Sequence, residues 1–281
     1  MAFNITLNSS NVIQGSNNTQ FQFNFISGNF TAKDLEMCVG AVTMPYSFFN
    51  VTSAYNNRTL QYTFPTSTTP ITRTLTLDAG FYTVTDINNA LQADMYSAGL
   101  YLNDSAGNPV YYLAMAYDTT YYAIRFLNYA FPISLPSGYT NPNSLTFPAT
   151  ATTTSFIIPA TNSLGTILGY SAGTYPATSS TTNKSQLGNI TPVGTTVQSL
   201  VLRCNLANNS IGFPTDAVDA FPINTTFGSN ITYDPSFEKW VQVRDGTYSN
   251  VIISIVDQNF NSIIARDPNV AITILFRKRK D

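Results

Sequence analysis

The fold is decided by an alternating stretch near the N-terminus, Phe21-Gln22-Phe23-Asn24-Phe25. Its aromatic and amide side chains alternate with a period of two, which places the rings on one face of a β-strand and the amides on the other. Turn-forming residues precede it at positions 15–18. Because aromatic and β-branched residues fit a pleated, half-buried surface, the stretch predicts a strand with one face in a core and one face in water.

Similar patterns occur in both outer thirds of the chain and predict a sandwich of about eight strands. Two packed antiparallel sheets with Greek-key connections form a jelly roll, although other sandwiches share this pattern. We expect an all-β protein, a single jelly-roll sandwich with an inserted α+β region. Residues 1–52 and 195–281 would form the jelly roll, and residues 53–194 the insertion. Further strands are expected at 37–44, 60–64, 72–77, 110–115, 121–126, 197–204, 239–244, 250–256 and 270–276.

Two central segments have helical rather than strand character. The first spans 83–95, where Thr85 can cap the N-terminus and Gly99 lies beyond the end. The second, 163–169, predicts a short helical turn that ends at Gly169. Residues 132–154 and 171–195 are rich in Pro, Gly, Ser and Thr and predict long loops. Four apolar residues of the first segment share one helical face: Val84, Ile87, Leu91 and Met95.

Composition argues against catalysis. The 281 residues include no histidine, and only 10% are charged, with a net charge of −2. Serine–histidine triads and histidine-containing zinc sites are therefore excluded. Asp216 and Asp219 are the closest carboxylates with site-like spacing, and such a pair can perform acid–base steps or bind calcium. They are expected in a loop beside Pro214, where turn and capping roles are favoured. We therefore expect that the protein is not an enzyme and that it has no catalytic or cofactor-binding residue, no metal site and no cofactor.

The remaining apolar and cysteine residues also indicate a core rather than a special site. Cys38 and Cys204 lie in apolar strand candidates, as buried free thiols do. No apolar run approaches the roughly 20 residues of a membrane-spanning helix. The N-terminus lacks the features of a secretory signal. Tyrosine-rich strands at 110–126 could stack on sugars or bases, but core packing is favoured.

One charged segment stands out at the C-terminus, where four cations follow one another: Arg277, Lys278, Arg279 and Lys280. One interpretation is a solvated terminus that keeps the last strand soluble. The other is a short basic tail that faces anionic material such as packaged nucleic acid. The sequence leaves both open.

Several short stretches together resemble the penton, or minor capsid, proteins of polinton-like viruses and virophages. Residue 260 departs from that pattern, because Phe260 stands where glycine is usual. The chain is too short for the two jelly rolls of the larger capsid proteins that share one of these motifs. The stretches are 4–13 (NITLNSSNVI), 44–52 (MPYSFFNVT), 55–57 (YNN), 78–91 (DAGFYTVTDINNAL), 164–170 (LGTILGY) and 255–259 (IVDQN).

The resemblance implies a structural virion protein, located at the capsid vertex and assembled inside the host cell. Five copies would form a homopentamer that contacts capsomers of a double jelly-roll major capsid protein. The basic tail would face inward, toward packaged DNA, and no small-molecule substrate or transmembrane segment is expected. A charge-poor surface suits such subunit contacts. The alternative is a viral spike or glycan-binding head domain that uses exposed Tyr and Asn of the central region.

Overall fold

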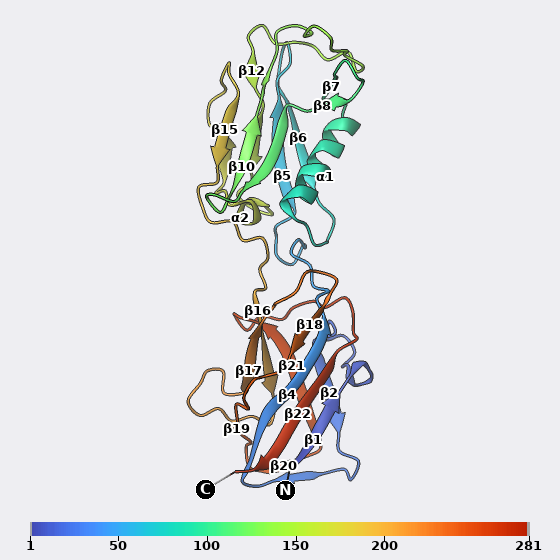
Figure 1. Ribbon diagram of the computed structural model, residues 1–281, viewed down its shortest axis with the longest axis vertical. Helices are drawn as coiled ribbons and strands as arrows, with labels where there is room; N and C mark the ends of the chain where they lie inside the picture. Colours follow the sequence, from blue (N-terminus) through green and yellow to red (C-terminus); the bar gives the residue numbers. More distant parts are fainter. Residues whose placement is uncertain (1, 280–281) are drawn as a thin grey trace. The chain divides into compact units, whose positions relative to one another are not determined.

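The chain folds into two compact units, which Figure 1 shows in a computed structural model that describes residues 2–279. Unit 1 contains Met1–Phe48 and Val197–Asp281, and unit 2 contains Phe49–Thr196. Unit 2 is therefore inserted into a connection between two strands of unit 1, β4 (Leu35–Pro45) and β16 (Ser199–Cys204).

Unit 1 is a sandwich of two antiparallel sheets. One has the strand order β1-β22-β4-β18, with the short strand β19 also paired to β4, and the other has the order β17-β16-β21-β2. A small pair, β3 with β20, lies beside them. The remaining bounds are β1 Ala2–Leu7, η1 Ser9–Asn11, β2 Gln20–Asn24, β3 Phe30–Ala32, β17 Ala217–Pro222, β18 Asn230–Tyr233, β19 Val241–Gln242, β20 Gly246–Tyr248, β21 Asn250–Asp257 and β22 Ala271–Lys278.

The pairing of these strands identifies a jelly roll. In chain order, the first main strand pairs with the last (β1 with β22), and the second with the last but one (β2 with β21). The two inner pairs follow the same rule, β4 with β18 and β16 with β17. This is one long antiparallel hairpin rolled up into two sheets, the topology of two Greek keys. The expected all-β jelly-roll fold is confirmed.

The register of the sheets follows the side-chain alternation. Ile5 lies opposite Ile274, and both are buried, whereas the neighbouring pair Thr6 and Thr273 faces outward. The pairing of β22 with β4 shifts by one residue at Gly40. A Cβ atom at Gly40 would come within 3.1 Å of the Leu275 side chain, so glycine allows close packing at this bulge.

Two strand expectations for unit 1 had different outcomes. The alternating stretch at Phe21 forms β2, with Phe21 fully buried opposite Ile253 of β21, as predicted. The strand expected at 239–244 is confirmed only in part, because only Val241–Gln242 forms a strand (β19), paired with β4, and only Val243 of that stretch is buried. Its alternation arises from a side chain that lies on the outer surface of the sheet, described below.

Unit 2 contains a helix, a short helical turn and several small sheets. The two main sheets have the orders β14-β13-β5-β6 and β15-β10-β9. The bounds are β5 Thr59–Phe64, β6 Ile71–Thr76, α1 Val84–Ser97, β7 Leu102–Asn103, β8 Pro109–Val110, β9 Leu113–Asp118, β10 Ala123–Asn128, β11 Ala130–Phe131, β12 Thr152–Thr153, β13 Ser155–Ile158, α2 Gly165–Leu168, β14 Gly173–Tyr175 and β15 Lys184–Leu187.

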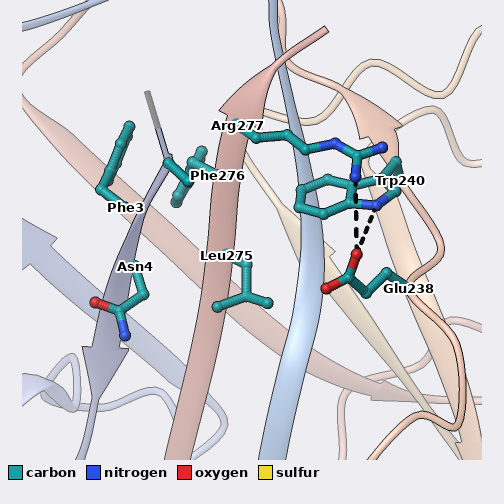
Figure 2. Close-up of a pocket in the computed structure, with 8 residues that line it drawn as sticks. Phe3, Asn4, Glu238, Trp240, Leu275, Phe276 and Arg277 are labelled. Carbon is teal, nitrogen blue, oxygen red and sulfur yellow. Dashed lines mark hydrogen bonds and ion pairs between the residues drawn. The ribbon is translucent and has the colours of Figure 1, made fainter. Parts of the chain in front are cut away.

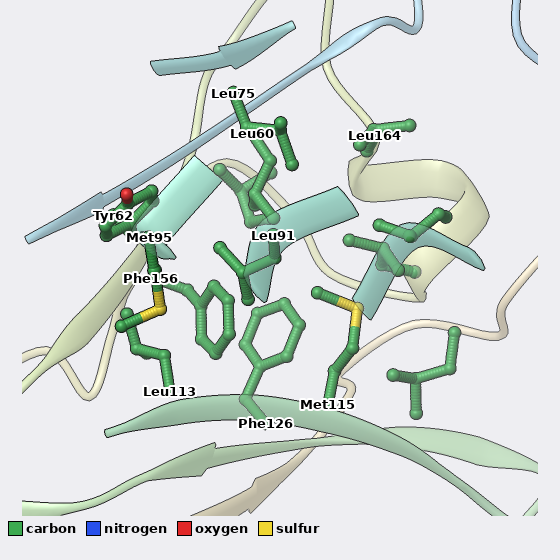
Figure 3. Close-up of a cluster of buried hydrophobic side chains, with 14 of the residues drawn as sticks. Leu60, Tyr62, Leu75, Leu91, Met95, Leu113, Met115, Phe126, Phe156 and Leu164 are labelled. Carbon is green, nitrogen blue, oxygen red and sulfur yellow. The ribbon is translucent and has the colours of Figure 1, made fainter. Parts of the chain in front are cut away.

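Helix α1 covers the core of unit 2 with the predicted apolar face. Ile87, Leu91 and Met95 are fully buried, and Figure 3 shows Leu91 and Met95 beside the rings of Phe126 and Phe156. These two rings stack with their centroids 4.1 Å apart. Because the core joins side chains from the helix and from both main sheets, unit 2 has a hydrophobic core of its own.

The ends of the helical segments differ in part from expectation. Thr83, not Thr85, caps α1, and Thr83 and Asp86 form a reciprocal capping box. The error was one of position, because the chain enters the helix two residues earlier. The turn α2 ends at Gly169 with φ of 75°, as expected. The segments expected as long loops contain the short strands β12, β14 and β15.

Candidate functional site

An aromatic cluster lies at the end of unit 1 where β1 begins and β22 ends; Figure 1 shows this end of the two strands. Phe3 of β1 stacks on Phe276 of β22 at a centroid distance of 4.9 Å and contacts Phe30 edge-on at 5.5 Å. Phe30 stacks in turn on Phe25 at 4.8 Å, and Phe25 contacts Phe23 at 5.7 Å. Only Phe276 of these five is fully buried. The rings thus join β1, β2, β3 and β22, which are far apart in the sequence.

A groove of about 470 Å³ lies beside this cluster, with Trp240 and Arg277 on one side and Leu275 among its lining residues. Figure 2 shows the Arg277 guanidinium stacked over the Trp240 indole, 3.7 Å from the ring centroid. Glu238 accepts a hydrogen bond from the indole N–H at 3.1 Å and lies 3.7 Å from the guanidinium. Arg277 also forms a close ion pair with Glu36 of β4. The stacking on Arg277 explains why an aromatic residue alternates with polar residues at Trp240, since the indole packs on a cation and not in a core.

The structure places three of the four terminal cations. Arg277 and Lys278 are the last residues of β22, and the backbone N–H of Arg279 donates to the Asp34 carbonyl at 2.8 Å. Lys280 lies outside the described residues. The described part of this basic segment is therefore paired into the sheet rather than extended away from it. Whether it faces inward in an assembly stays a prediction.

A second hollow of about 400 Å³ lies at the same end. It is lined by Lys33 and Lys278, together with Phe3, Phe30 and Leu35. Thr31 and Asp34 complete the lining. Sequence reasoning missed Lys33, because the β3–β4 turn and the C-terminus are distant in the chain and are brought together only by the pairing of β22 with β4.

The two aspartates singled out from the sequence do not form a joint site. Asp216 pairs with Arg203 at 2.8 Å. Asp219 lies in strand β17, not in the expected loop, and pairs with Lys239 at 2.7 Å while accepting a hydrogen bond from Tyr233 at 2.7 Å. The hydrogen bond to Asp219 raises the pKa of the Lys239 ammonium. Each carboxylate therefore balances a cation, which is a structural role.

The cysteines are buried free thiols, as expected. Burial raises the pKa of the Cys38 thiol to about 11 and that of the Cys204 thiol to about 12. A thiol needs to ionise to act as a nucleophile, so neither is activated. Within residues 2–279, no group of three or more His, Cys, Asp or Glu side chains is arranged to hold a metal ion. In the same range, no helix combines the length and apolar character needed to span a membrane.

An apolar loop projects from unit 1 between β16 and β17. Ile211 and Phe213 are 98% and 89% exposed, although both are large apolar side chains. Hydrogen bonds hold the backbone of this loop in place, because the Asn209 side chain accepts from the N–H groups of Ile211 and Gly212. Its base is closed by a hydrogen bond from the Asn209 N–H to the Thr215 carbonyl. No sequence pattern indicated this feature, because an exposed Ile and a buried Ile look alike in a sequence.

In unit 2, motifs from the sequence meet at one point. The buried Asn50 side chain donates hydrogen bonds to the carbonyls of Tyr82 (2.8 Å) and Gly194 (2.7 Å) and accepts one from the Tyr82 N–H. Val51 and Gly80 also bond to each other through their backbones. The stretches 44–52 and 78–91 therefore form one structural junction.

Unit 2 also contains a polar triad at the edge of its core. Asp94 of α1 binds Arg73 through two hydrogen bonds of 2.9 Å and accepts a bond of 2.6 Å from the buried Tyr62 hydroxyl. The hydrogen bond from Arg73 holds the pKa of Asp94 below its ordinary value. The triad ties α1 to β5 and β6.

The tyrosines of unit 2 differ in burial. Tyr62 and Tyr170 are buried, and Tyr170 stacks on Phe126 at 3.8 Å. In the stretch 110–126, Tyr112 is buried, as core packing predicts, whereas Tyr117 is exposed. Tyr121 and Tyr122 are also exposed in the turn after β9, because β10 begins only at Ala123.

Comparison with known proteins gives structural similarity alone. No family model matches the sequence, and no curated protein matches it. The fold is similar to the penton protein of mavirus, with 10% sequence identity, 99% of both chains covered and a TM-score of 0.47. It is also similar to a chain in the structure of the Sputnik virophage, with 13% identity, 99% of this chain and 97% of that chain covered, and a TM-score of 0.40.

Proposed function

We propose that this chain is a structural virion protein, a penton or minor capsid subunit that forms homopentamers at the vertices of an icosahedral capsid. The strand pairing of unit 1 carries the proposal, because eight strands rolled into two sheets is the architecture of viral capsid subunits. Lectins and cupins share this fold, so the fold alone does not distinguish a capsid subunit from these proteins, and the side chains of the candidate site are needed as well.

Two further observations favour a capsid subunit. The described carboxylates that had a site-like spacing are occupied in separate ion pairs, which favours a non-enzymatic role. Two motifs that carry the resemblance to penton proteins, 44–52 and 78–91, form one buried junction through Asn50 and Tyr82. The two motifs therefore have a structural role in this chain, which is expected if they carry a resemblance in fold.

The distribution of apolar surface supports a ring. A ring needs a heterologous contact, in which one flank of each subunit meets the opposite flank of the next. The exposed Ile211 and Phe213 precede β17, an edge strand of one sheet. The Trp240 groove is lined partly by β1, the edge strand of the other sheet. We therefore assign the loop to the subunit interface, and capsomers of a double jelly-roll major capsid protein are the expected outer neighbours.

The mass of the purified protein in solution, with negative-stain images, tests the proposal. Rings of five, alone or on addition of the partner capsid protein, are the expected result. A stable trimer that binds glycans through unit 2 would overturn the proposal in favour of a spike or receptor-binding protein.

A further inference from the structure

The unpaired cations of unit 1 are gathered at one end. Of the described residues in this unit, Lys33, Arg244, Lys278 and Arg279 are exposed and take part in no ion pair. By contrast, Arg203, Lys239 and Arg277 are each paired with a carboxylate. We name the four unpaired residues the basic end.

Backbone pairing fixes the four residues of the basic end close to one another. Lys278 lies in β22 directly opposite Leu35 of β4, and Lys33 is two residues before that strand partner. The Arg279 N–H binds the Asp34 carbonyl at 2.8 Å, and the Asp34 N–H binds the Asp245 carboxylate at 3.0 Å, next to Arg244. Figure 1 places the start of β1, the end of β22 and β20 at this end of unit 1.

The acidic groups at the basic end do not neutralise it. Asp34 and Asp245 are the two carboxylates within the turns, and the Asp245 side chain accepts a backbone N–H rather than a cation. Glu36 and Glu238 both pair with the same cation, Arg277. Among the described residues of this end, five cations including Arg277 therefore face four carboxylates, on a chain whose overall net charge is −2.

We propose that the basic end binds the phosphodiester backbone of nucleic acid, without reading its sequence. The hollow between Lys33 and Lys278 is open to solvent on a polar rim, while its apolar lining, Phe3, Phe30 and Leu35, is half-buried. Membrane-surface binding relies on apolar side chains that insert beneath the headgroups. The three apolar side chains of this hollow are recessed, which leaves Ile26 as a single fully exposed apolar side chain in the neighbouring turn. Phosphate contacts need only exposed cations.

This inference rests on the proposed function, because a vertex subunit presents one surface to the packaged genome. A single basic end offers few contacts, so one copy binds weakly. A ring presents five copies at once, and linked sites raise the overall affinity without any new contact. The assignment differs from a basic tail in including Lys33 and Arg244, which are far from the C-terminus in sequence.

Binding of a labelled DNA duplex to the full chain by fluorescence anisotropy tests the inference. When one subunit binds the duplex and neutralises about four phosphates, affinity should fall roughly 100-fold as salt rises from about 50 to about 200 mM. The fall should be steeper when further subunits of a ring bind the same duplex. Lys33→Gln should weaken binding and make the salt slope shallower by about one unit per bound subunit. Lys184→Gln removes the same charge from unit 2 and should leave the slope unchanged.

Each alternative result has a defined meaning. Equal effects of Lys33→Gln and Lys184→Gln, or the absence of salt-dependent duplex binding by the wild-type chain, would overturn the inference. Binding to phosphatidylserine vesicles but not to the duplex would also overturn it, and would point to a membrane surface with the fully exposed Ile26 as an inserting side chain. Masses measured on the same samples separate this from the proposed function, since rings that fail to bind the duplex contradict only the inference.

Discussion

Replacing Ile211 by serine should impair assembly without affecting the folded subunit. Ile211 is 98% exposed, so its side chain contributes almost no burial to unit 1. The hydrogen bond that orders the loop uses its backbone N–H and survives the change. If the loop is buried against the next subunit, the substitution removes that burial from every contact of the ring.

The size of the effect follows from the area that the side chain can bury. Complete burial of an isoleucine side chain is worth about 2 kcal/mol. A ring of five has five such contacts but forms in four association steps, so the loss is about 2.5 kcal/mol per step. The concentration at which half the subunits are assembled should then rise roughly 70-fold.

Sedimentation velocity over a range of protein concentrations measures this midpoint, with added partner capsid protein if the subunit alone does not assemble. Ile133→Ser, the same substitution at a 59% exposed site of unit 2, is the matched control. Denaturant unfolding at a protein concentration below the assembly midpoint of the wild type should give the same unfolding midpoint for Ile211→Ser and the wild type, because assembly itself stabilises the folded chain. Unchanged assembly of Ile211→Ser, or an equal loss in Ile133→Ser, would refute the assignment of the loop to the interface.

Three further predictions concern the folded chain. Asp94→Ala should lower the free energy of unfolding of unit 2 by about 2–3 kcal/mol in urea titrations, because it leaves the buried Tyr62 hydroxyl without its acceptor. The control Asp78→Ala, at a fully exposed carboxylate, should change the free energy of unfolding little. Equal effects of the two substitutions would contradict the argument. Since its folded-state pKa is lowered, Asp94 stabilises the fold at pH values above its ordinary pKa, and this stabilisation is lost as pH falls through the lowered value. At pH values below about 4, the urea concentration at the unfolding midpoint should therefore decrease. A parallel decrease in Asp94→Asn would exclude Asp94 as the cause. A thiol reagent at about pH 8 should label Cys38 and Cys204 only in denaturant, since their pKa values are raised to about 11 and about 12; rapid labelling of the folded chain would contradict their burial.

The sequence was informative wherever local rules decide structure. The apolar spacing of Ile87, Leu91 and Met95 predicted α1 and its buried face, and the alternation at Phe21 predicted β2. Both signals depend on residues only a few positions apart. The strand expected at 239–244 was predicted too long for the same reason, because alternation does not distinguish a ring buried in a core from Trp240 stacked on Arg277.

Features built from distant segments could not be predicted in this way. Strand β17 contains Asp219 and ends at Pro222, so its composition resembles that of a loop, and only its pairing with β16 makes it a strand. The basic end likewise depends on the pairing of β22 with β4, which brings Lys278 close to Lys33. The terminal cations were visible in the sequence, but their neighbours were not.

The hydrogen bonds of Asn50 have a consequence for how such a chain can change over time. Its amide joins the segment that enters unit 2 to the segment that leaves it, through Tyr82 and Gly194. An insertion whose two ends are held together internally requires little of its host beyond two neighbouring attachment points. The module can therefore diverge, or be exchanged for another, while the eight main strands of unit 1 keep their order.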